Sequence, residues 1–215
     1  TDGEIWFQKS NQEMVDLNSL SNKKMRLLRG DMQMIFQDPF SSLNPRMNLL
    51  DLVGEPMLVN GLKNRKERSE RVAELLRLVG LRAEYMQRFP HAFSGGQRQR
   101  IVIARALALN PRLVIADEPV SALDVSVQAQ VLNLMLELQE RLNLTYLFVA
   151  HDLSVIKHIS NRVAVMYVGK IIETATTEDL FNTPKHPYTA ALMSAVPASD
   201  PRVRSRMRPL EGDVP

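Results

Sequence analysis

The chain has 215 residues, of which 45% are hydrophobic and 24% charged, with a formal net charge of +3. This size and composition are typical of one globular domain, with room for an inserted subdomain, that can bury a sizeable core. The absence of cysteine excludes disulfides and cysteine-ligated metals, and no apolar run reaches the roughly 20 residues that span a bilayer. Because the basic residues form only short clusters, we expect no nucleic-acid partner.

In chain order, strand patterns alternate with helical ones. The predicted strands cover residues 3–7, 32–36, 113–116, 145–150, 162–168 and 170–174. The predicted helices cover residues 23–29, parts of 49–88, 94–109, 126–142, 153–159, 178–181 and 187–196. Residues 41–45 carry turn chemistry and are expected to form a loop. This alternation predicts an α/β fold with a mainly parallel sheet and a helical insertion at about residues 45–105.

The two most apolar strands should lie inside that sheet. Residues 113–116 contain no polar side chain, which is typical of a strand buried on both faces of a parallel sheet. Residues 145–150 are expected to form another buried strand.

The segment Ser94-Gly95-Gly96-Gln97 predicts a helix start that holds an anion. Ser94 is a favourable N-cap, whereas Gly95 and Gly96 each cost a helix about 1 kcal/mol relative to Ala. Glycines make sense there if backbone N–H groups must approach a phosphate closely. A plain tight turn into a helix is the simpler alternative, and the following Gln97 and arginines favour the anion site.

Carboxylates and a histidine follow the apolar strands. Asp117 and Glu118 come directly after one strand, where α/β sheets place ligands. We expect Asp117 to hold Mg²⁺ and Glu118 to orient or deprotonate an attacking water. His151 follows the next strand and could donate to a phosphate oxygen, while Gln37, after residues 32–36, could contact Mg²⁺ or its water. Each of these residues, taken alone, has an ordinary structural explanation.

These features suggest a nucleotide triphosphatase, yet the phosphate-binding loop of that class is missing. The chain has no Gly-x-x-x-x-Gly-Lys-Ser/Thr, and its one Gly-Lys pair, Gly169-Lys170, lacks the required context. The chain begins at Thr1 without Met, and both ends look cut. We therefore expect the loop to lie before Thr1, and the 215 residues alone to be inactive.

Five motifs in this order resemble the ATP-binding subunits of ABC transporters. Gln37 matches the Q-loop, residues 93–97 match the signature motif with Phe93 where Leu is usual, and residues 113–118 match Walker B. Residues 121–124, ending in Asp124, match the D-loop, and His151 matches the switch histidine. The segments at 36–46, 119–130 and 184–188 resemble the oligopeptide/dipeptide importers, and most closely the second of their two paired ATPases.

The resemblance implies a P-loop NTPase fold, ATP and Mg²⁺ as ligands, and hydrolysis that drives import of oligopeptides or dipeptides. Catalysis would fall to Glu118, His151 and Gln37, with Asp117 and Gln37 at the metal. Ser94, Gly95, Gly96, Gln97 and Asp124 would contact nucleotide, the signature residues serving the partner's ATP.

The resemblance also implies partners and a location. The partners would be a second ATPase subunit (a paralogue or a copy), two membrane-spanning permease subunits and, indirectly, an extracytoplasmic solute-binding protein. The location would be peripheral, on the cytoplasmic face of the cell membrane. The transported solute, whether peptide, nickel or sugar, is left open.

Three hypotheses of function follow, and all three share one domain organisation. Residues 1–182 are expected to form the ATPase domain and residues 183–215 a transporter-type extension. The first reading is the importer ATPase. The second is a soluble ABC-type ATPase that acts on nucleic acid or ribosomes, and the third is a non-catalytic docking or regulatory chain.

Overall fold

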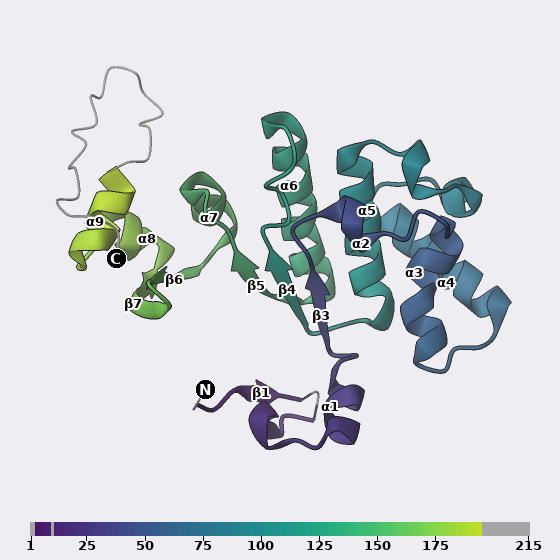
Figure 1. Ribbon diagram of the computed structural model, residues 1–215, viewed down its shortest axis with the longest axis horizontal. Coiled ribbons are helices and arrows are strands. Elements are labelled where there is room, and N and C mark those ends of the chain that lie inside the picture. Colours follow the sequence, from purple (N-terminus) through teal and green to yellow (C-terminus); the bar gives the residue numbers. More distant parts are fainter. Residues whose placement is uncertain (1–2, 10, 195–215) are drawn as a thin grey trace. The chain divides into compact units, whose positions relative to one another are not determined.

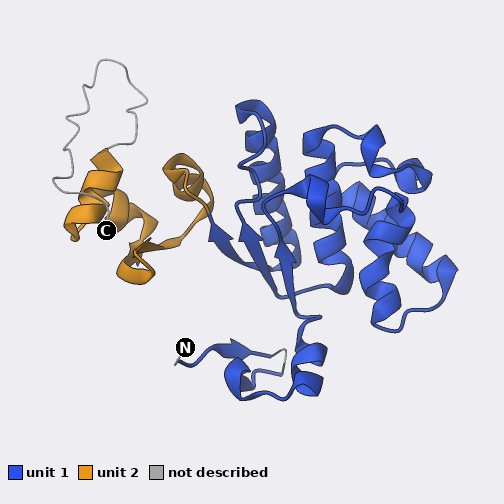
Figure 2. Ribbon diagram, in the orientation of Figure 1, with its two compact units in different colours: residues 1–149 blue, residues 150–215 orange. Residues whose placement is uncertain are grey.

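The computed structural model describes residues 3–9 and 11–194. The chain divides into two compact units, residues 1–149 and residues 150–215 (Figure 2). The first unit contains the strands and helices that carry most of the predicted site, and the second begins just before His151.

A parallel three-stranded sheet lies at the centre of the first unit (Figure 1). Its order is β3 (Met32–Ile35), β4 (Leu113–Asp117) and β5 (Thr145–Val149). The register pairs Ile35 with Ala116, and Ala116 with Phe148. Since parallel strands end at the same edge, the residues after β3, β4 and β5 emerge from one edge of the sheet.

The two faces of this sheet differ in exposure. Ile35, Val114 and Ala116 are buried on one face, whereas Met34, Leu147 and Val149 are exposed on the other. The prediction that residues 145–150 form a buried strand is therefore wrong for this structure, because the described helices bury only one face. For the same reason β4 is fully buried only at alternate positions.

Helices make up most of the rest of the first unit, and three of them make the helical insertion beside the sheet (Figure 1). These are α3 (Leu49–Val59), α4 (Arg65–Leu78) and α5 (Gly95–Ala106). Each begins at a polar N-cap, respectively Asn48, Asn64 and Ser94, whose side chain accepts a backbone N–H of the first turn. The long helix α6 (Val125–Leu142) connects β4 to β5.

The insertion is held by an apolar core. Its helices contribute leucine, isoleucine and valine side chains that are 0–1% exposed: Leu49, Leu52, Val53, Val72, Leu75, Leu76, Ile101 and Ile103. The spacing of these residues is helical, which is why the pattern could be read from the sequence. The predicted helical insertion without a strand is confirmed.

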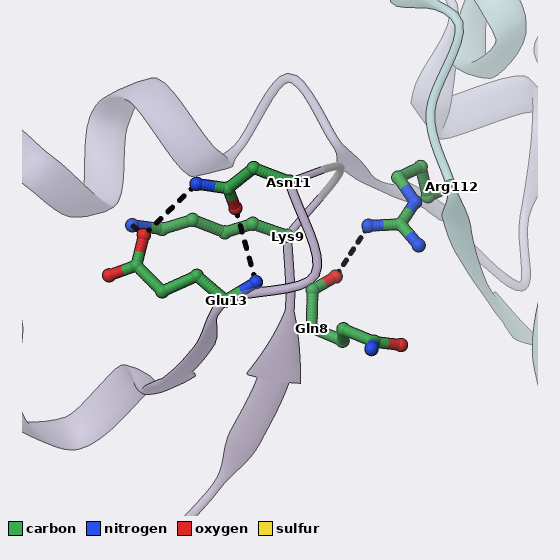
Figure 3. Close-up of polar contacts among 5 residues, drawn as sticks. All are labelled: Gln8, Lys9, Asn11, Glu13 and Arg112. Atoms are coloured by element: carbon green, nitrogen blue, oxygen red, sulfur yellow. Dashed lines mark hydrogen bonds and ion pairs between the residues drawn. The ribbon is translucent and has the colours of Figure 1, made fainter.

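An antiparallel hairpin of β1 (Trp6–Gln8) and β2 (Met14–Asp16) precedes α1 (Asn22–Leu28). Lys9 pairs with Glu13 at 3.0 Å, and Asn11 also bonds to Glu13 (Figure 3). Arg112 Nη1, one residue before β4, donates to the carbonyl of Gln8 at 2.6 Å. A side chain at the start of the central strand thus binds the hairpin.

The second unit begins with helix α7 (Leu153–Ile159), which is followed by the antiparallel strands β6 (Arg162–Tyr167) and β7 (Lys170–Thr176). The helices α8 (Thr177–Asn182) and α9 (Pro187–Ser194) follow. The pKa of the Glu173 carboxyl is lowered by the side chain of Thr189 and by the backbone N–H groups of Lys185 and His186, which donate to it at 2.8 and 3.0 Å. The predicted hairpin is confirmed.

Two local predictions were wrong. The strand expected at residues 3–7 is β1, three residues long, and its partner β2 was missed. The loop expected at 41–45 begins inside the short helix α2 (Pro39–Ser42), because Asp38 caps the N–H of Phe40. Residues 195 and 196, predicted to end the last helix, lie outside the described residues. None of the helices in the described part of the chain combines the length and apolar character needed to cross a membrane.

Candidate active site

The sheet edge brings Gln37 and Glu118 together. The β3–β4 register pairs Ile35 with Ala116, so two residues further along each strand Gln37 lies level with Glu118. Gln37 Nε2 donates to Glu118 Oε2 at 2.7 Å, across 81 residues of sequence. Asp117, half-buried, is the last residue of β4. Three of the predicted site residues therefore gather at one edge of the sheet.

The backbone at Glu118 is unusual. Its φ is 45°, in the left-handed region that costs an L-residue roughly 1–2 kcal/mol. The Glu118 N–H donates to the carbonyl of Val149 at 2.9 Å, and its own carbonyl accepts from Ser121 N and Oγ at 3.2 and 3.0 Å. Backbone strain that surrounding hydrogen bonds hold in place is a feature of functional sites. The left-handed conformation also changes the direction of the chain immediately after β4.

The donor set at this edge suits a hard divalent cation that shares its coordination with phosphate and water. Asp117 and Glu118 supply carboxylate oxygens, and the Gln37 nitrogen is engaged by Glu118, which leaves the amide oxygen as the ligand atom. Among the described residues no group of three or more His, Cys, Asp or Glu could hold a metal by itself. The residues fit Mg²⁺ bound with a nucleotide, and the predicted role of Asp117 stays a prediction.

The start of α5 forms a capping box. Ser94 Oγ accepts from Gln97 N at 3.4 Å, and Gln97 Oε1 accepts from Ser94 N at 3.1 Å. Gly95 and Gly96 come next to the cap, where a helix supplies no carbonyl partner for its amides. The two polar side chains thus stabilise the helix start, and the two glycine amides remain as the groups suited to an anion.

The two glycines differ in the space around them. A Cβ on Gly96 would lie 2.3 Å from Val127 Cγ1 of α6, which real structures do not allow. A Cβ on Gly95 would lie 3.5 Å from Leu123 Cδ2, an ordinary contact. Gly96 is therefore required by the packing of α5 on α6, whereas the packing leaves Gly95 open to substitution.

Asp124 is the N-cap of α6. Its Oδ1 accepts from Val127 N at 3.0 Å and from Ser126 Oγ at 2.8 Å. These bonds hold the pKa of the Asp124 carboxyl below its usual value. The side chain has a structural role, and the contact with nucleotide predicted for it stays a prediction.

His151 is the second residue of the second unit, two residues after Val149 at the end of β5, and its side chain is exposed. The next residue, Asp152, caps α7 by accepting from Ser154 N at 2.8 Å. The switch role of His151 stays a prediction.

The sequence reading missed residues that connect this edge to α5. Arg98 stacks on Phe40, with Cζ 4.2 Å from the ring centre, and Arg105 donates to the carbonyl of Ser42 at 3.0 Å. The side chain of Gln99 is 0% exposed and has no hydrogen-bond partner among the described residues. A buried glutamine on an otherwise apolar helix face was the signal that could have marked α5 as more than a core helix.

Comparison with known families gives the chain its class. Residues 1–121, more than half of the chain, match the family described as "ABC transporter". The chain belongs to the ABC transporter family. Residues 172–215 match a second family, described as "Oligopeptide/dipeptide transporter, C-terminal region".

Relatives of this ABC transporter chain include peptide-transport proteins. It is 54% identical over 218 residues to "Oligopeptide transport ATP-binding protein AppF" of Bacillus subtilis, covering 100% of the chain and 65% of that protein. It is also 54% identical over 214 residues to "Dipeptide transport ATP-binding protein DppF" of Lactococcus lactis, covering 99% of the chain and 67% of that protein. The chain thus spans about two thirds of the length of these relatives.

Solved structures of the ABC class share the fold. A dimeric, post-hydrolysis state of the ATP-binding cassette MJ0796, bound to ADP and Pi, matches with a TM-score of 0.68 at 29% identity. That match covers 82% of this chain and 74% of the other. CbiO1 of Clostridium perfringens, part of the transporter complex cbiONQ, matches with a TM-score of 0.69 at 27% identity over 80% of this chain and 68% of its own. The predicted P-loop NTPase fold is confirmed.

Proposed function

We propose that the chain belongs to an ATP-binding and ATP-hydrolysing subunit that powers import of oligopeptides or dipeptides. The observation that carries the proposal is the Gln37–Glu118 bond of 2.7 Å at the carboxyl edge of a parallel sheet. In this bond the carboxylate of Glu118, a candidate general base, accepts from the side-chain amide of Gln37. The two peptide-transport relatives at 54% identity support the substrate class.

In this proposal Glu118 positions a water and takes its proton. One carboxylate oxygen is engaged by Gln37 in the structure, which fixes the side chain at the edge of the sheet. The role proposed for His151 is to donate to a phosphate oxygen, and Asp117 with Gln37 would hold Mg²⁺. When bound, Mg²⁺–ATP supplies the electrophilic phosphorus and the metal charge that stabilises the leaving group.

The start of α5 would serve a second nucleotide. The amides of Gly95 and Gly96 offer donors at a helix N-terminus, and the Ser94–Gln97 capping box holds that turn in shape. Asp124 holds the start of α6, against which Gly96 packs. We propose that this end contacts the ATP bound by a second ATPase subunit, a paralogue or a copy.

The proposed setting is the cytoplasmic face of the cell membrane. There the subunit would pair with the second ATPase and contact two membrane-spanning permease subunits, with an extracytoplasmic solute-binding protein as an indirect partner. The peptide-transporter match over residues 172–215 supports this setting. The alternative of an ATPase acting on nucleic acid or ribosomes finds no support in the relatives named above.

The test is Glu118→Gln in the complete ATPase assembled with its partner subunits. We expect ATP turnover to fall by roughly 10²–10⁴-fold, because an amide cannot take the proton of the water, while ATP binding is retained. Glu137→Gln is the matched control, since Glu137 lies on α6 in an exposed pair with Arg141.

Further results of this experiment decide between the three hypotheses of function. Near-normal turnover in Glu118→Gln would refute the role of Glu118, and no ATP binding by the wild-type assembly would favour the non-catalytic reading. Uptake of a labelled dipeptide that stops in the Glu118→Gln variant would support the substrate class. Uptake of nickel or a sugar in its place would overturn it.

A further inference from the structure

Two arginines of α5 reach the segment that follows Gln37. Arg98 and Arg105 lie about two helical turns apart, so they project from one side of α5. Arg98 contacts Phe40, and Arg105 contacts Ser42. The helix that begins at the signature residues is thus bound at two points to the four-residue helix that begins just after Gln37.

The first point is a cation–π contact with fixed geometry. The Arg98 guanidinium lies 4.2 Å from the centre of the Phe40 ring. Its Nε donates to the carbonyl of Pro90 at 2.9 Å, and Nη2 donates to His91 at 3.5 Å. The two carbonyl groups of the turn before α5 therefore fix the orientation of the guanidinium, and the exposed Phe40 ring stacks on it.

The second point is an ion pair that also binds the backbone. Arg105 Nη2 pairs with Glu55 Oε2 of α3 at 2.6 Å, and Nη1 donates to the carbonyl of Ser42 at 3.0 Å. A planar guanidinium with two donors engaged in different directions fixes the last residue of α2 relative to both helices.

The segment between these points and Gln37 is short and stiff. Pro39 has a restricted φ, and the Asp38 carboxylate accepts from Phe40 N at 2.7 Å. Ser42 Oγ donates to the carbonyl of Asp38 at 2.6 Å. A displacement of Gln37 therefore cannot be absorbed within residues 38–42 and passes to the contacts with α5.

We propose that Arg98 and Arg105, with Phe40, Ser42 and Glu55, form an arginine clamp that transmits the position of Gln37 at Glu118 to the first turn of α5. This inference rests on the proposed function, in which Gln37 lies at the chain's own nucleotide and Gly95 and Gly96 lie at the partner's. Arg98 and Phe40 are positioning residues that touch neither nucleotide. Their role is to link the two half-sites within one chain.

The first experiment measures kcat and KM for ATP in the complete, assembled transporter. Arg98→Met and Phe40→Leu should each lower kcat by about 3- to 30-fold, the range that corresponds to a partly desolvated cation–π contact, with KM changed by less than about 2-fold. The double variant should fall no further than either single one, because both remove the same contact. Phe40→Tyr keeps an aromatic face and should retain wild-type kcat.

Arg100→Met is the matched control. Arg100 lies on the same helix but donates to the carbonyl of Val79 at 2.8 Å, away from α2. It should leave kcat and KM near wild type. Equal effects of Arg98→Met and Arg100→Met, or losses that multiply in the Arg98/Phe40 double variant, would refute the clamp.

A second experiment needs no hydrolysis and separates the clamp from the proposed function. Amide hydrogen exchange of residues 95–98 is measured in the nucleotide-free subunit with and without Gln37→Ala. Loss of the Gln37–Glu118 bond should raise this exchange at least about 3-fold in the wild-type background, and not in the Phe40→Leu background. An equal response in both backgrounds overturns the clamp, even if Glu118→Gln abolishes ATP turnover as expected.

Discussion

Gly96→Ala tests the packing of the signature helix directly. The added methyl would lie 2.3 Å from Val127 Cγ1, so one of the helices α5 and α6 must shift. Valine in a helix has one strongly preferred χ1 rotamer, which prevents an easy escape by rotation. Overpacking of this kind costs about 1–3 kcal/mol, offset by roughly 0.4–1 kcal/mol because alanine restricts the unfolded chain.

We expect a net destabilisation of about 1–2 kcal/mol, which lowers Tm by about 2–8 °C, at the roughly 2–4 °C per kcal/mol typical of 150–250 residues. The assay is thermal unfolding of the complete subunit, with Gly95→Ala as the matched control. A Cβ at Gly95 meets Leu123 Cδ2 at an ordinary 3.5 Å, so its Tm should equal or slightly exceed that of the wild type, because alanine restricts the unfolded chain without overpacking the folded one.

Val127→Ala provides the decisive arm of this experiment. It removes the atom at 2.3 Å and leaves the Val127 Cβ at 3.7 Å from the added methyl. The Gly96→Ala/Val127→Ala double variant should therefore be no less stable than Val127→Ala alone, with a coupling energy of about 1–2 kcal/mol. Strictly additive losses in the double variant would show that the contact between α5 and α6 is not what requires glycine.

The other predictions concern the two ends of α6. Asp124→Asn keeps an acceptor for Val127 N without a titrating charge. Because the pKa of Asp124 is lowered from 3.8 in the folded state, its contribution is fully present above that pH and is lost as pH falls through the folded pKa. The Tm difference between wild type and Asp124→Asn should thus shrink as the pH falls below 3.8 and through the lowered folded-state pKa, and a constant difference would contradict the charge-based cap. At the C-terminal end of α6, Asn143 has φ 51° and its backbone N–H donates to the carbonyl of Gln139. Because glycine adopts this left-handed conformation without strain, Asn143→Gly should keep or raise Tm. Asn143→Val should cost about 1–2 kcal/mol, and equal Tm values for these two would refute the argument.

Much of the fold follows from local signals that the sequence displays. Ser94 marked the start of α5 because it is a favourable N-cap, and the structure adds a capping box with Gln97. The edge formed by Asp117 and Glu118 followed from one apolar strand and the general geometry of α/β sheets. Gln37 was expected near that edge because it follows a second strand, and its hydrogen bond to Glu118 at 2.7 Å lies there.

What was missed depends on long-range packing. The exposed face of β5 could not be read from Leu147 and Val149, because an apolar strand has the same pattern whether one face or two are covered. The strand β2 is only three residues long and pairs across a turn, so its periodicity is too short to detect. The stacking of Arg98 on Phe40 requires the folded relation of α2 and α5, which no spacing within either segment reveals.

The left-handed backbone at Glu118 also bears on how such a site can be lost. A conformation near φ 45° accepts glycine, asparagine and aspartate most readily and disfavours β-branched residues. Replacements that remove or shorten the carboxylate are therefore among those that the backbone tolerates best. A chain of this family can thus become silent in hydrolysis without first becoming unstable, and a folded, assembled subunit is no guarantee of an active one.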